Sequence, residues 1–486
     1  MIYMFYNKFR TYLSLLIFLT VVFLLRTFLW LYANLDLGFD EAQYWTWSEN
    51  LDWGYYSKPP FLAWLLSIFT TICGNAEVCV RISSPILHSI SAFFIGLTCL
   101  NFSKNKNASF IAASIWILIP GISLSSGFIS TDVPLLFFTS IALWAFSCII
   151  FLDNKKLYYL LLSLTLSLGF LSKYAIIYPI IAIIIAIIVE KKILIKLKNN
   201  FSFLHLLFIV FVFVTLIFNH LHWNYINSFI TAQHTLANAN INGEGGGFRN
   251  LIKFFLEQFI VFGPITLIVL FSILYNYKKL PVEEKILIFL TFTPLFLVMV
   301  QAFISRAHAN WAAISYIPAT VLVSLQIIRY WPRIKVIYYG IISIGLLFAV
   351  LIPLSSQHNF GLDPFKKYRG WSNLGLEVSK VYASYPKAVL VTDDRRVMAE
   401  LLYYMKNKPK NWVRWNADGY IHDHYELVTS HSDLKNEIGI MVSSEPNNQH
   451  FSSSFQKVTF LKDLYRNISN QKNKKYKVWL LEGYKE

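Results

Sequence analysis

The sequence predicts a polytopic helical membrane domain followed by a small α/β domain, and three observations support this fold class. Only 14% of the 486 residues are charged and 56% are hydrophobic, whereas an average soluble domain has roughly 25% charged residues. Uncharged runs of about 18 to 22 residues recur, and each is long enough to cross an apolar layer about 30 Å thick. After about residue 355 these runs stop. The composition excludes a soluble dinucleotide-binding enzyme and a nucleic-acid-binding module.

Apolar runs cover most of residues 1–354, and we interpret them as about eleven membrane spans. The first run follows Lys8 and Arg10 and has no small-residue cleavage site, so it should remain as an uncleaved span. The runs lie at 12–33, 82–100, 108–128, 133–152, 157–171, 174–189, 203–221, 251–275, 286–304, 311–328 and 336–354.

The basic residues between the runs predict an orientation. With the N-terminus inside, the inside loops carry nearly all of them: Lys104, Lys106, Lys155, Lys156, Lys191, Lys192, Lys196, Lys198, Lys278, Lys279, Lys285, Arg329, Arg333 and Lys335. The outside loops, at 34–80, 125–132, 222–250 and 305–310, hold only Lys58, Arg249 and Arg306. Cytoplasmic loops of membrane proteins are enriched in Lys and Arg. Much of the net charge of +16 is therefore a topology signal.

The segment 355–486 has mixed charge and is predicted to form a separate domain. An odd number of spans places it outside the cytoplasm. Residues 388–392, 438–442 and 477–481 have the pattern of strands, and 396–406 that of an amphipathic helix. We therefore expect a membrane domain over 1–354 and a small α/β domain over 355–486.

The first outside loop is richest in polar residues that could carry chemistry. Asp40 and Glu41 follow the first span, and Lys58 precedes two prolines. A carboxylate could accept a proton from an attacking hydroxyl, and the lysine could hold a phosphate leaving group. A structural interpretation is also open, with Asp40 and Gln43 as a capping box and the tyrosines and tryptophans as an aromatic belt.

Two further outside loops contain charged residues at the edges of spans. Asp132 lies in the Thr-Asp-Val-Pro segment before the fourth run, where it is either a site carboxylate or the N-cap of a helix that has Pro134 in its first turn. Arg306 could bind phosphate through two parallel hydrogen bonds, or extend to the interface as a snorkelling side chain. Lys173, between two runs, is better explained as an interface anchor.

Other candidate features have plain structural explanations. His422 and His424 have no neighbouring third metal ligand in the sequence, so we expect ordinary surface residues. Cys73 and Cys79 could meet in an outside loop, but small buried thiols are the commoner use of cysteine. The glycine-rich stretch 243–247 lacks the Gly-Lys-Ser/Thr ending of a phosphate loop and is expected to be a flexible connection.

Taken together, the Asp40–Glu41 pair, the segment Tyr55–Pro60 and the Thr-Asp-Val-Pro loop resemble a known family. They are similar to the C-fold (GT-C) glycosyltransferases that use polyprenyl-phosphate sugars, in particular the protein O-mannosyltransferase and lipid A aminoarabinose transferase group and its bacterial lipopolysaccharide-modifying branch. The resemblance extends over the whole chain, since these enzymes have about eleven to thirteen spans and many end in a periplasmic α/β domain.

The resemblance implies roles for individual residues. It implies a catalytic or acceptor-orienting carboxylate at Asp40, the family's second-loop carboxylate at Asp132 and a lipid-phosphate contact at Lys58. We count Glu41 with Asp40 and Asp132 as a catalytic candidate. We add Arg306, Tyr44, Tyr56 and His234 as residues that bind substrate or lipid phosphate. The chain departs from the aminoarabinose transferases, which have an arginine at the position of Gln43 and an acid at that of Ser57. The departure at Ser57 leaves a divalent cation open as a cofactor.

The function implied by the resemblance is transfer of a sugar from an undecaprenyl-phosphate carrier to lipid A or the lipopolysaccharide core, at the periplasmic side of the inner membrane. Membrane lipids would surround the enzyme, and no nucleic acid would be a partner. Two alternatives remain. A protein O-glycosyltransferase would share the donor and the site, and a transporter of lipid-linked sugars would favour an inverted repeat, which the sequence does not show.

Overall fold

The computed structural model describes residues 2–153, 155–240, 246–357, 363–469 and 472–485. The chain divides into two compact units. The membrane unit comprises residues 1–32, 58–62 and 81–354, and the second unit comprises residues 33–57, 63–80 and 355–486. The second unit therefore contains most of the first outside loop as well as the C-terminal segment.

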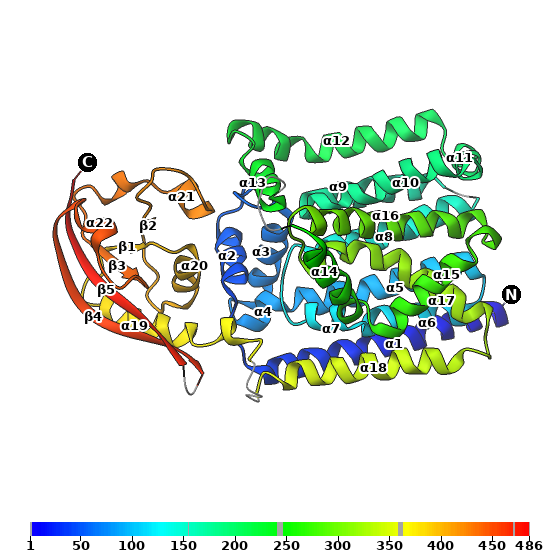
Figure 1. The fold of residues 1–486 in the computed structure, drawn as a ribbon, viewed down its shortest axis with the longest axis horizontal. Coiled ribbons are helices and arrows are strands. Elements are labelled where there is room, and N and C mark those ends of the chain that lie inside the picture. The colour runs from blue at the N-terminus through cyan, green and yellow to red at the C-terminus, as the bar shows by residue number, and fades with distance from the viewer. Residues whose placement is uncertain (1, 154, 241–245, 358–362, 470–471, 486) are drawn as a thin grey trace. The chain divides into compact units, whose positions relative to one another are not determined.

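Helices cover every one of the eleven predicted spans in the membrane unit. They are α1 (Ile2–Ala33), α5 (Ser83–Ser103), α6 (Lys106–Leu118), α7 (Pro120–Ser125), α8 (Asp132–Phe151), α9 (Lys156–Ser172), α10 (Ile177–Val189), α11 (Lys191–Lys198), α12 (Phe203–Ile226), α13 (Ile230–Ala239), α14 (Phe248–Val261), α15 (Pro264–Tyr275), α16 (Val282–Ile304), α17 (Tyr316–Arg329) and α18 (Lys335–Leu354), with short 3-10 turns at Tyr174–Ile176, Tyr277–Lys279 and Ala309–Ser315. Most of the long helices run along a common direction (Figure 1).

Seven helices among the described residues are long and apolar enough to cross a membrane, or eight if the bent pair α14 and α15 counts as one span. The count is below eleven for physical reasons. The run 108–128 is broken at Pro120 into α6 and α7, because proline cannot continue a helix hydrogen-bond ladder. The run 251–275 bends by 111° at Gly263 and Pro264. The runs at 157–171 and 174–189 form helices shorter than 18 residues.

Burial separates central from peripheral helices in the membrane unit. The most apolar windows of α8 and of the stretch Ala309–Arg329 are 78% buried, whereas that of α12 is only 11% buried. A helix that is apolar on all sides and exposed needs an apolar solvent. We therefore assign α12 to the lipid-facing periphery. Asp132 begins the central helix α8.

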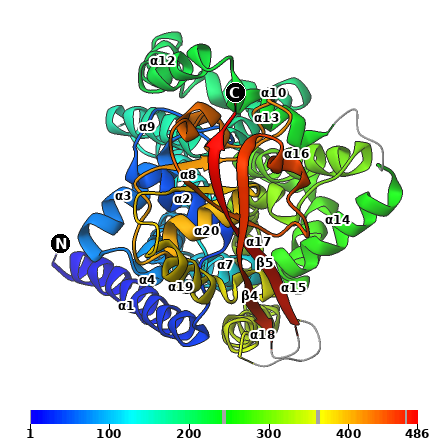
Figure 2. The same ribbon diagram turned by 90° about the vertical axis from the view of Figure 1, so that its left-hand side faces the viewer.

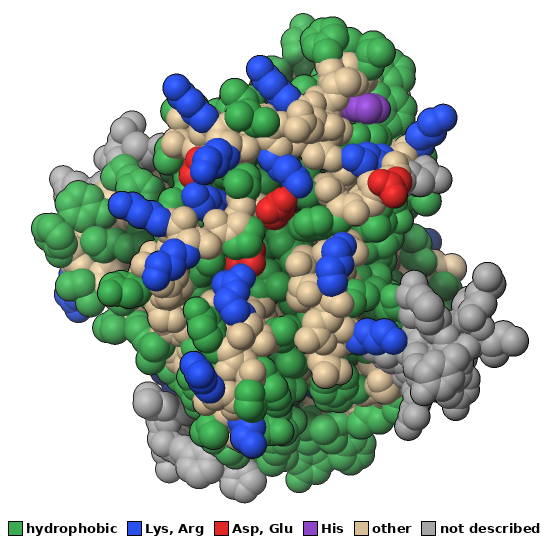
Figure 3. Space-filling model, turned by 90° about the vertical axis from the view of Figure 1, so that its right-hand side faces the viewer, with side chains coloured by type: hydrophobic (Ala, Val, Ile, Leu, Met, Phe, Trp, Pro, Cys, Tyr) green, Lys and Arg blue, Asp and Glu red, His purple; other side chains and the backbone are tan. Residues whose placement is uncertain are grey.

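One end of the membrane unit is strongly basic. Figure 3 shows Lys and Arg side chains spread over this face, with few acidic ones among them. Helix ends and the segments between helices carry exposed basic residues: Lys104, Lys106, Lys156, Lys191, Lys192, Lys198, Lys278, Lys279, Arg329, Arg333 and Lys335. Contacts of Lys104 with the Phe151 ring, of Lys196 with Glu283 and of Arg329 with Glu284 join several of these helix ends.

The second unit contains a five-stranded sheet, with strand order β2-β1-β3-β5-β4. Its strands are β1 (Val389–Thr392), β2 (Trp412–Arg414), β3 (Gly439–Ser443), β4 (Phe455–Ser469) and β5 (Lys472–Tyr484). The first three are parallel, and β5 pairs antiparallel with both β3 and β4. Figure 2 shows β4 and β5 as a long twisted hairpin. The predicted strands at 388–392, 438–442 and 477–481 all lie within this sheet.

Helices complete the second unit. They are α2 (Phe39–Glu49), α3 (Phe61–Cys73, counted here from Ala63), α4 (Glu77–Arg81, counted to Val80), α19 (Trp371–Tyr382), α20 (Arg395–Tyr404), α21 (His424–Val428) and α22 (Gln449–Ser452), with 3-10 turns at Lys366–Tyr368 and His431–Leu434. The predicted helix at 396–406 corresponds to α20. The part of the glycine-rich stretch at 243–245 lies outside the described residues.

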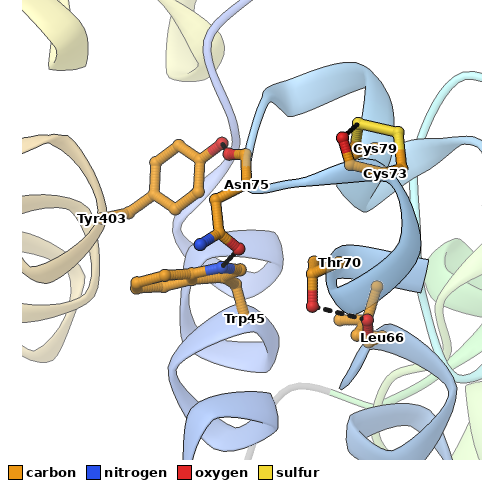
Figure 4. The surroundings of a disulfide bond; sticks show 7 residues. All are labelled: Trp45, Leu66, Thr70, Cys73, Asn75, Cys79 and Tyr403. Carbon is orange, nitrogen blue, oxygen red and sulfur yellow. Dashed lines mark hydrogen bonds between the residues drawn. A yellow bond between two sulfur atoms is a disulfide. The ribbon is translucent and has the colours of Figure 1, made fainter. Parts of the chain in front are cut away.

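A disulfide joins Cys73 to Cys79, so the expectation of free thiols at these positions was wrong. The bond closes the turn between α3 and α4, as Figure 4 shows. In the same turn, the side-chain oxygen of Asn75 accepts a hydrogen bond from Trp45 Nε1 at 2.8 Å, and its carbonyl oxygen accepts one from the Tyr403 hydroxyl. The turn thereby links α2 to α20. The other two cysteines, Cys99 and Cys148, are free and buried.

Candidate active site

Asp40 and Glu41 lie in the first turn of α2 but face different surroundings. Asp40 has 54% of its side chain exposed. Glu41 is buried, and its carboxylate accepts the backbone N–H of Gly38 at 2.9 Å. A carboxylate in the first turn that accepts from the N-cap backbone stabilises a helix start. The capping box is therefore formed by Gly38 and Glu41, and the interpretation of Asp40 and Gln43 as a capping box was wrong.

Gln43 and Asp40 share a partner in the second unit. The Nη1 atom of Arg395 donates to Gln43 Oε1 at 3.0 Å and lies 3.7 Å from Asp40 Oδ1. The guanidinium also stands 5.3 Å from the centre of the Phe39 ring. Arg395 is the first residue of α20, more than 350 positions along the chain, and the sequence analysis did not select it.

The predicted binding tyrosines of the first loop, Tyr44 and Tyr56, lie in or near an aromatic core of the second unit that includes Trp47 and Tyr55. Tyr44 is buried, with its ring centre 5.3 Å from that of Trp47. Tyr56 is half-buried, and its hydroxyl donates to the Ile421 carbonyl at 3.3 Å. Burial raises the pKa of Tyr56, as do Asp423 and Glu426. The Tyr56 hydroxyl therefore stays protonated and able to donate.

His424 is packed against this aromatic core, so the expectation of an ordinary surface residue was wrong for it. Its ring stands 5.3 Å from the rings of both Trp47 and Tyr55. Burial lowers its pKa to about 4. His422 is exposed and pairs with Asp418 at 2.9 Å, in line with a surface role.

In the membrane unit, Asp132 is held by two donors. Lys173 Nζ and Asn310 Nδ2 each donate to a different carboxylate oxygen of Asp132, both at 2.6 Å. Asp132 is buried, and the preceding Thr131 makes no side-chain cap. The carboxylate therefore does not act as a simple helix cap. Lys173 does lie at a helix junction, but its ammonium pairs with Asp132, which the anchor interpretation missed.

Arg306 and His308 lie in the same short segment as Asn310. Arg306 is exposed, between the end of α16 and the 3-10 turn at Ala309–Ser315. Burial lowers the pKa of His308, and the charge of Arg306 lowers it further. The segment therefore presents one permanent cation and a histidine that tends to remain neutral.

The other two predicted binding residues of the membrane unit occupy different elements. Lys58 is half-buried and directly precedes Pro59 and Pro60, which lead into α3. His234 is on α13, and its Nε2 lies 2.8 Å from Asn238 Nδ2 one turn further on. Pro59 and Pro60, which follow Lys58, are both buried. The backbone beside Lys58 is therefore restrained by two fixed φ angles.

Arg26, inside the first span, is hydrogen-bonded to the broken stretch α6–α7 that precedes the Asp132 loop. Arg26 is buried and donates to Ser123 Oγ at 2.8 Å, to Ser126 Oγ at 3.1 Å and to the Ile117 carbonyl. These acceptors lie at the break between α6 and α7 and just after α7. A broken helix in a membrane must satisfy its freed backbone groups internally. Arg26 thus stabilises the broken stretch that precedes the Asp132 loop.

The membrane unit contains an apolar cavity of about 460 Å³. Ile176 and Ile314, near Lys173 and Asn310 in the chain, line one part of it, and Lys198 lines another. The remaining lining is apolar except for Thr139 and comes from α8 to α12, α16 and α17, with Phe201 from the connection before α12. A cavity of this volume and composition suits an apolar chain.

No group of three or more His, Cys, Asp or Glu side chains among the described residues is placed to hold a metal ion.

Comparison with known proteins identifies the family. The protein family described as dolichyl-phosphate-mannose-protein mannosyltransferase matches residues 57–218. The lipid A galacturonosyltransferase RgtD of Rhizobium johnstonii is 31% identical over 378 residues, which are 76% of this chain and 78% of that protein. The chain belongs to the GT-C family of membrane glycosyltransferases. It is a multi-pass membrane enzyme that depends on a polyprenyl-phosphate sugar.

The GT-C fold is also found in solved structures. Crystal structures of ArnT from Cupriavidus metallidurans, in the apo state and bound to undecaprenyl phosphate, match with TM-scores of 0.63 and 0.65. Sequence identity is 12% and 15%, and the matches cover 96% of this chain and 97% of each ArnT chain. The predicted fold class, an all-α membrane domain with a small α/β domain, is confirmed.

Proposed function

We propose that this GT-C glycosyltransferase transfers a hexuronosyl group from undecaprenyl phosphate to lipid A or the lipopolysaccharide core, at the periplasmic side of a bacterial inner membrane. The observation that carries the proposal is the 31% identity with a lipid A galacturonosyltransferase over three quarters of both chains. Its name supports the sugar and the acceptor, and the undecaprenyl phosphate in one ArnT structure supports the carrier.

The basic end of the membrane unit supports the proposed orientation. Positive charge is retained on the cytoplasmic side, which favours assigning the face in Figure 3 to the cytoplasm. The second unit, including the first-loop residues 33–57 and the sheet, is then periplasmic. A reporter enzyme that is active only in the periplasm, fused after residue 486, would be active under this orientation. A reporter active only in the cytoplasm would be active at the same position if the orientation were reversed.

The donor lipid would use features of the membrane unit. The apolar cavity beside Ile176 and Ile314 accommodates part of the polyprenyl tail. Lys58 and Arg306 bind the phosphate, which carries the negative charge that develops as the leaving group departs. Asp132 is held by Lys173 and Asn310 on both oxygens, so its role is to position these donors rather than to accept a proton.

Asp40 would act on the acceptor. The acceptor oxygen attacks the anomeric carbon, the bond from that carbon to the phosphate oxygen breaks, and undecaprenyl phosphate leaves with the electron pair. When the acceptor is a hydroxyl, Asp40 takes its proton. When it is a phosphate, the attacking oxygen is already anionic, and Asp40 orients the acceptor or the sugar. Because Asp40 is more than half exposed, it can reach either acceptor.

The test is mass spectrometry of lipid A and core oligosaccharide from cells that lack the gene and carry the wild type, Asp40→Asn or Asp52→Asn. Asp52 is an exposed carboxylate of the same loop and serves as the matched control. We expect a 176 Da hexuronosyl mass, about the mass of a hexuronic acid less water, to be lost only in the null and Asp40→Asn cells. Unchanged glycolipids in the null cells, with sugars lost from proteins, would contradict the lipid acceptor and favour the protein O-glycosyltransferase.

A further inference from the structure

The C-terminal segment supplies a cation beside Asp40. Arg395 contacts both Gln43 and Asp40 through its Nη1 atom, at 3.0 and 3.7 Å. Its side chain is 39% exposed and that of Asp40 is 54% exposed. All of these residues belong to the second unit. The carboxylate proposed to act on the acceptor therefore has a solvent-accessible guanidinium within reach.

Packing of the second unit does not require this arginine. The Trp45 and Tyr403 rings already meet edge to face at 5.0 Å, and the Tyr404 hydroxyl accepts the Leu37 N–H at 2.7 Å. These contacts join α2 and its preceding residues to α20. An exposed ion pair adds little to the stability of a folded protein. Arg395 therefore contributes little to the stability of the second unit.

The start of α20 also does not explain an arginine at this position. A cation in the first turn of a helix opposes the helix dipole. The neighbouring Arg396 has a local partner, since its guanidinium forms a close pair with the N-cap residue Asp394 at 2.7 Å. Arg395 has no such contact with the cap, and points instead to α2.

The other acidic residues in this region pair with a different arginine and do not occupy Arg395. Asp423 and Glu426, which lie near Tyr56, are both paired with Arg414, at 3.1 and 3.5 Å. The contacts of Arg395 to Gln43 and Asp40 use one of its two terminal nitrogens. A guanidinium has five N–H donors in a planar fork that matches the two oxygens of a carboxylate or phosphate. Gln43 and Asp40 hold this fork in place from one side.

We propose that Arg395 is a specificity-determining residue that binds an oxyanion of the substrate, either the carboxylate of the transferred sugar or a phosphate of the acceptor. The proposal rests on the proposed function, because it assigns to Asp40 a place beside the reacting groups. It assigns the C-terminal segment a direct part in substrate selection. A neutral sugar on a neutral acceptor would gain nothing from Arg395.

The test uses the purified full-length enzyme in lipid nanodiscs, as wild type, Arg395→Gln, Arg395→Lys and the control Arg396→Gln. Transfer is measured with hexuronosyl and neutral hexosyl donors, each with phosphorylated and dephosphorylated lipid A. Losing a charged hydrogen bond costs about 1.5 to 3 kcal/mol, so the affected KM should rise about 10- to 100-fold in Arg395→Gln. Arg395→Lys should recover part of the loss, and Arg396→Gln should resemble the wild type.

The four substrate pairs identify the source of the oxyanion. If Arg395 binds the sugar carboxylate, only the hexuronosyl donor is affected. If it binds the acceptor phosphate, only the phosphorylated acceptor is affected. Equal KM values for Arg395→Gln and wild type with all four pairs would overturn the proposal while leaving the proposed function intact.

A binding measurement separates this proposal from a failure of the proposed function. Ligand-observed NMR would compare methyl hexuronide with methyl hexoside, and glucosamine phosphate with glucosamine, on the wild type and Arg395→Gln. If the wild type transfers no sugar yet binds one of the anionic probes through Arg395, the acceptor or donor assignment fails and the anion site stands. If Arg395→Gln binds every probe as the wild type does, the anion site is refuted.

Discussion

The two carboxylates singled out in the sequence occupy contrasting environments. Asp132, at the head of the central helix α8, is buried, and both of its oxygens accept hydrogen bonds at 2.6 Å. Asp40, on the short helix α2, is more than half exposed, and its nearest charged partner is 3.7 Å away. A buried carboxylate whose two oxygens both accept hydrogen bonds holds its neighbours in position, whereas a solvent-accessible carboxylate can contact a substrate. The contrast supports our proposal that Asp132 positions its neighbours and that Asp40 acts on the acceptor.

The strongest test of this contrast is Asp40→Asn. Loss of a general base typically costs 10²- to 10⁴-fold in rate, so we expect transfer to a hydroxyl acceptor to fall by about that factor. The thermal unfolding temperature should stay within about 1 °C, because an exposed ion pair contributes little. Transfer at the wild-type rate, with an acceptor hydroxyl, would remove Asp40 from the chemistry.

Lys58→Ala should have the next largest effect. An electrostatic contact to a leaving group supplies about 2.7 to 4 kcal/mol in the transition state, which corresponds to about 10² to 10³ in kcat. Lys104→Ala, at the basic end of the same unit, is the matched control and should leave kcat unchanged. A rise in KM for the donor with unchanged kcat would show that Lys58 binds the lipid without stabilising its departure.

Asp132 should behave differently, since its loss leaves a lysine without its anion. We expect Asp132→Asn to destabilise the membrane unit by about 1 to 3 kcal/mol and to lower transfer through misplaced neighbours. Adding Lys173→Gln should restore part of the stability, which a double-mutant cycle in detergent would measure. Additive losses in the cycle would show that the two side chains do not interact as the structure indicates.

The smallest expected effect is a pH dependence of the second unit. Burial holds the pKa of His424 at about 4, below its value of about 6.5 in an unfolded chain. The stabilisation is therefore complete above about pH 6.5 and is lost as the pH falls toward 4. Between pH 7 and 5 the loss should be about 2 kcal/mol, visible as lower hydrogen-exchange protection factors over residues 44–56 once the pH dependence of intrinsic exchange is divided out. The protection factors of His424→Phe should depend less on pH.

The sequence predicted most of the membrane unit because its elements are specified by composition. Each of the eleven apolar runs is helical, since in hydrocarbon a backbone must satisfy its own hydrogen bonds. Breaks at Pro120 and Gly263 were missed because the runs stay apolar through them. Strand β4 was also missed, because its burial does not alternate regularly and its pairing with β5 has register shifts.

The candidate site was only partly predictable. Asp40, Lys58 and Asp132 stand in recognisable local patterns, so the sequence points to them. The partners of the two carboxylates come from distant segments: Arg395 from α20, and Lys173 and Asn310 from two further helix junctions. Asn310 lies in the segment quoted for Arg306, but no local pattern connects it to Asp132. Only the tertiary fold brings these pairs together.

The bond between Cys73 and Cys79 bears on how the enzyme is made. Disulfides persist in oxidising compartments and are rare in the cytosol. Under the proposed orientation, the turn that links α2 to α20 is completed only after the first loop has left the cytoplasm. Maturation of the second unit would then depend on the envelope's thiol oxidases, and a chain retained in the cytoplasm would keep four reduced cysteines.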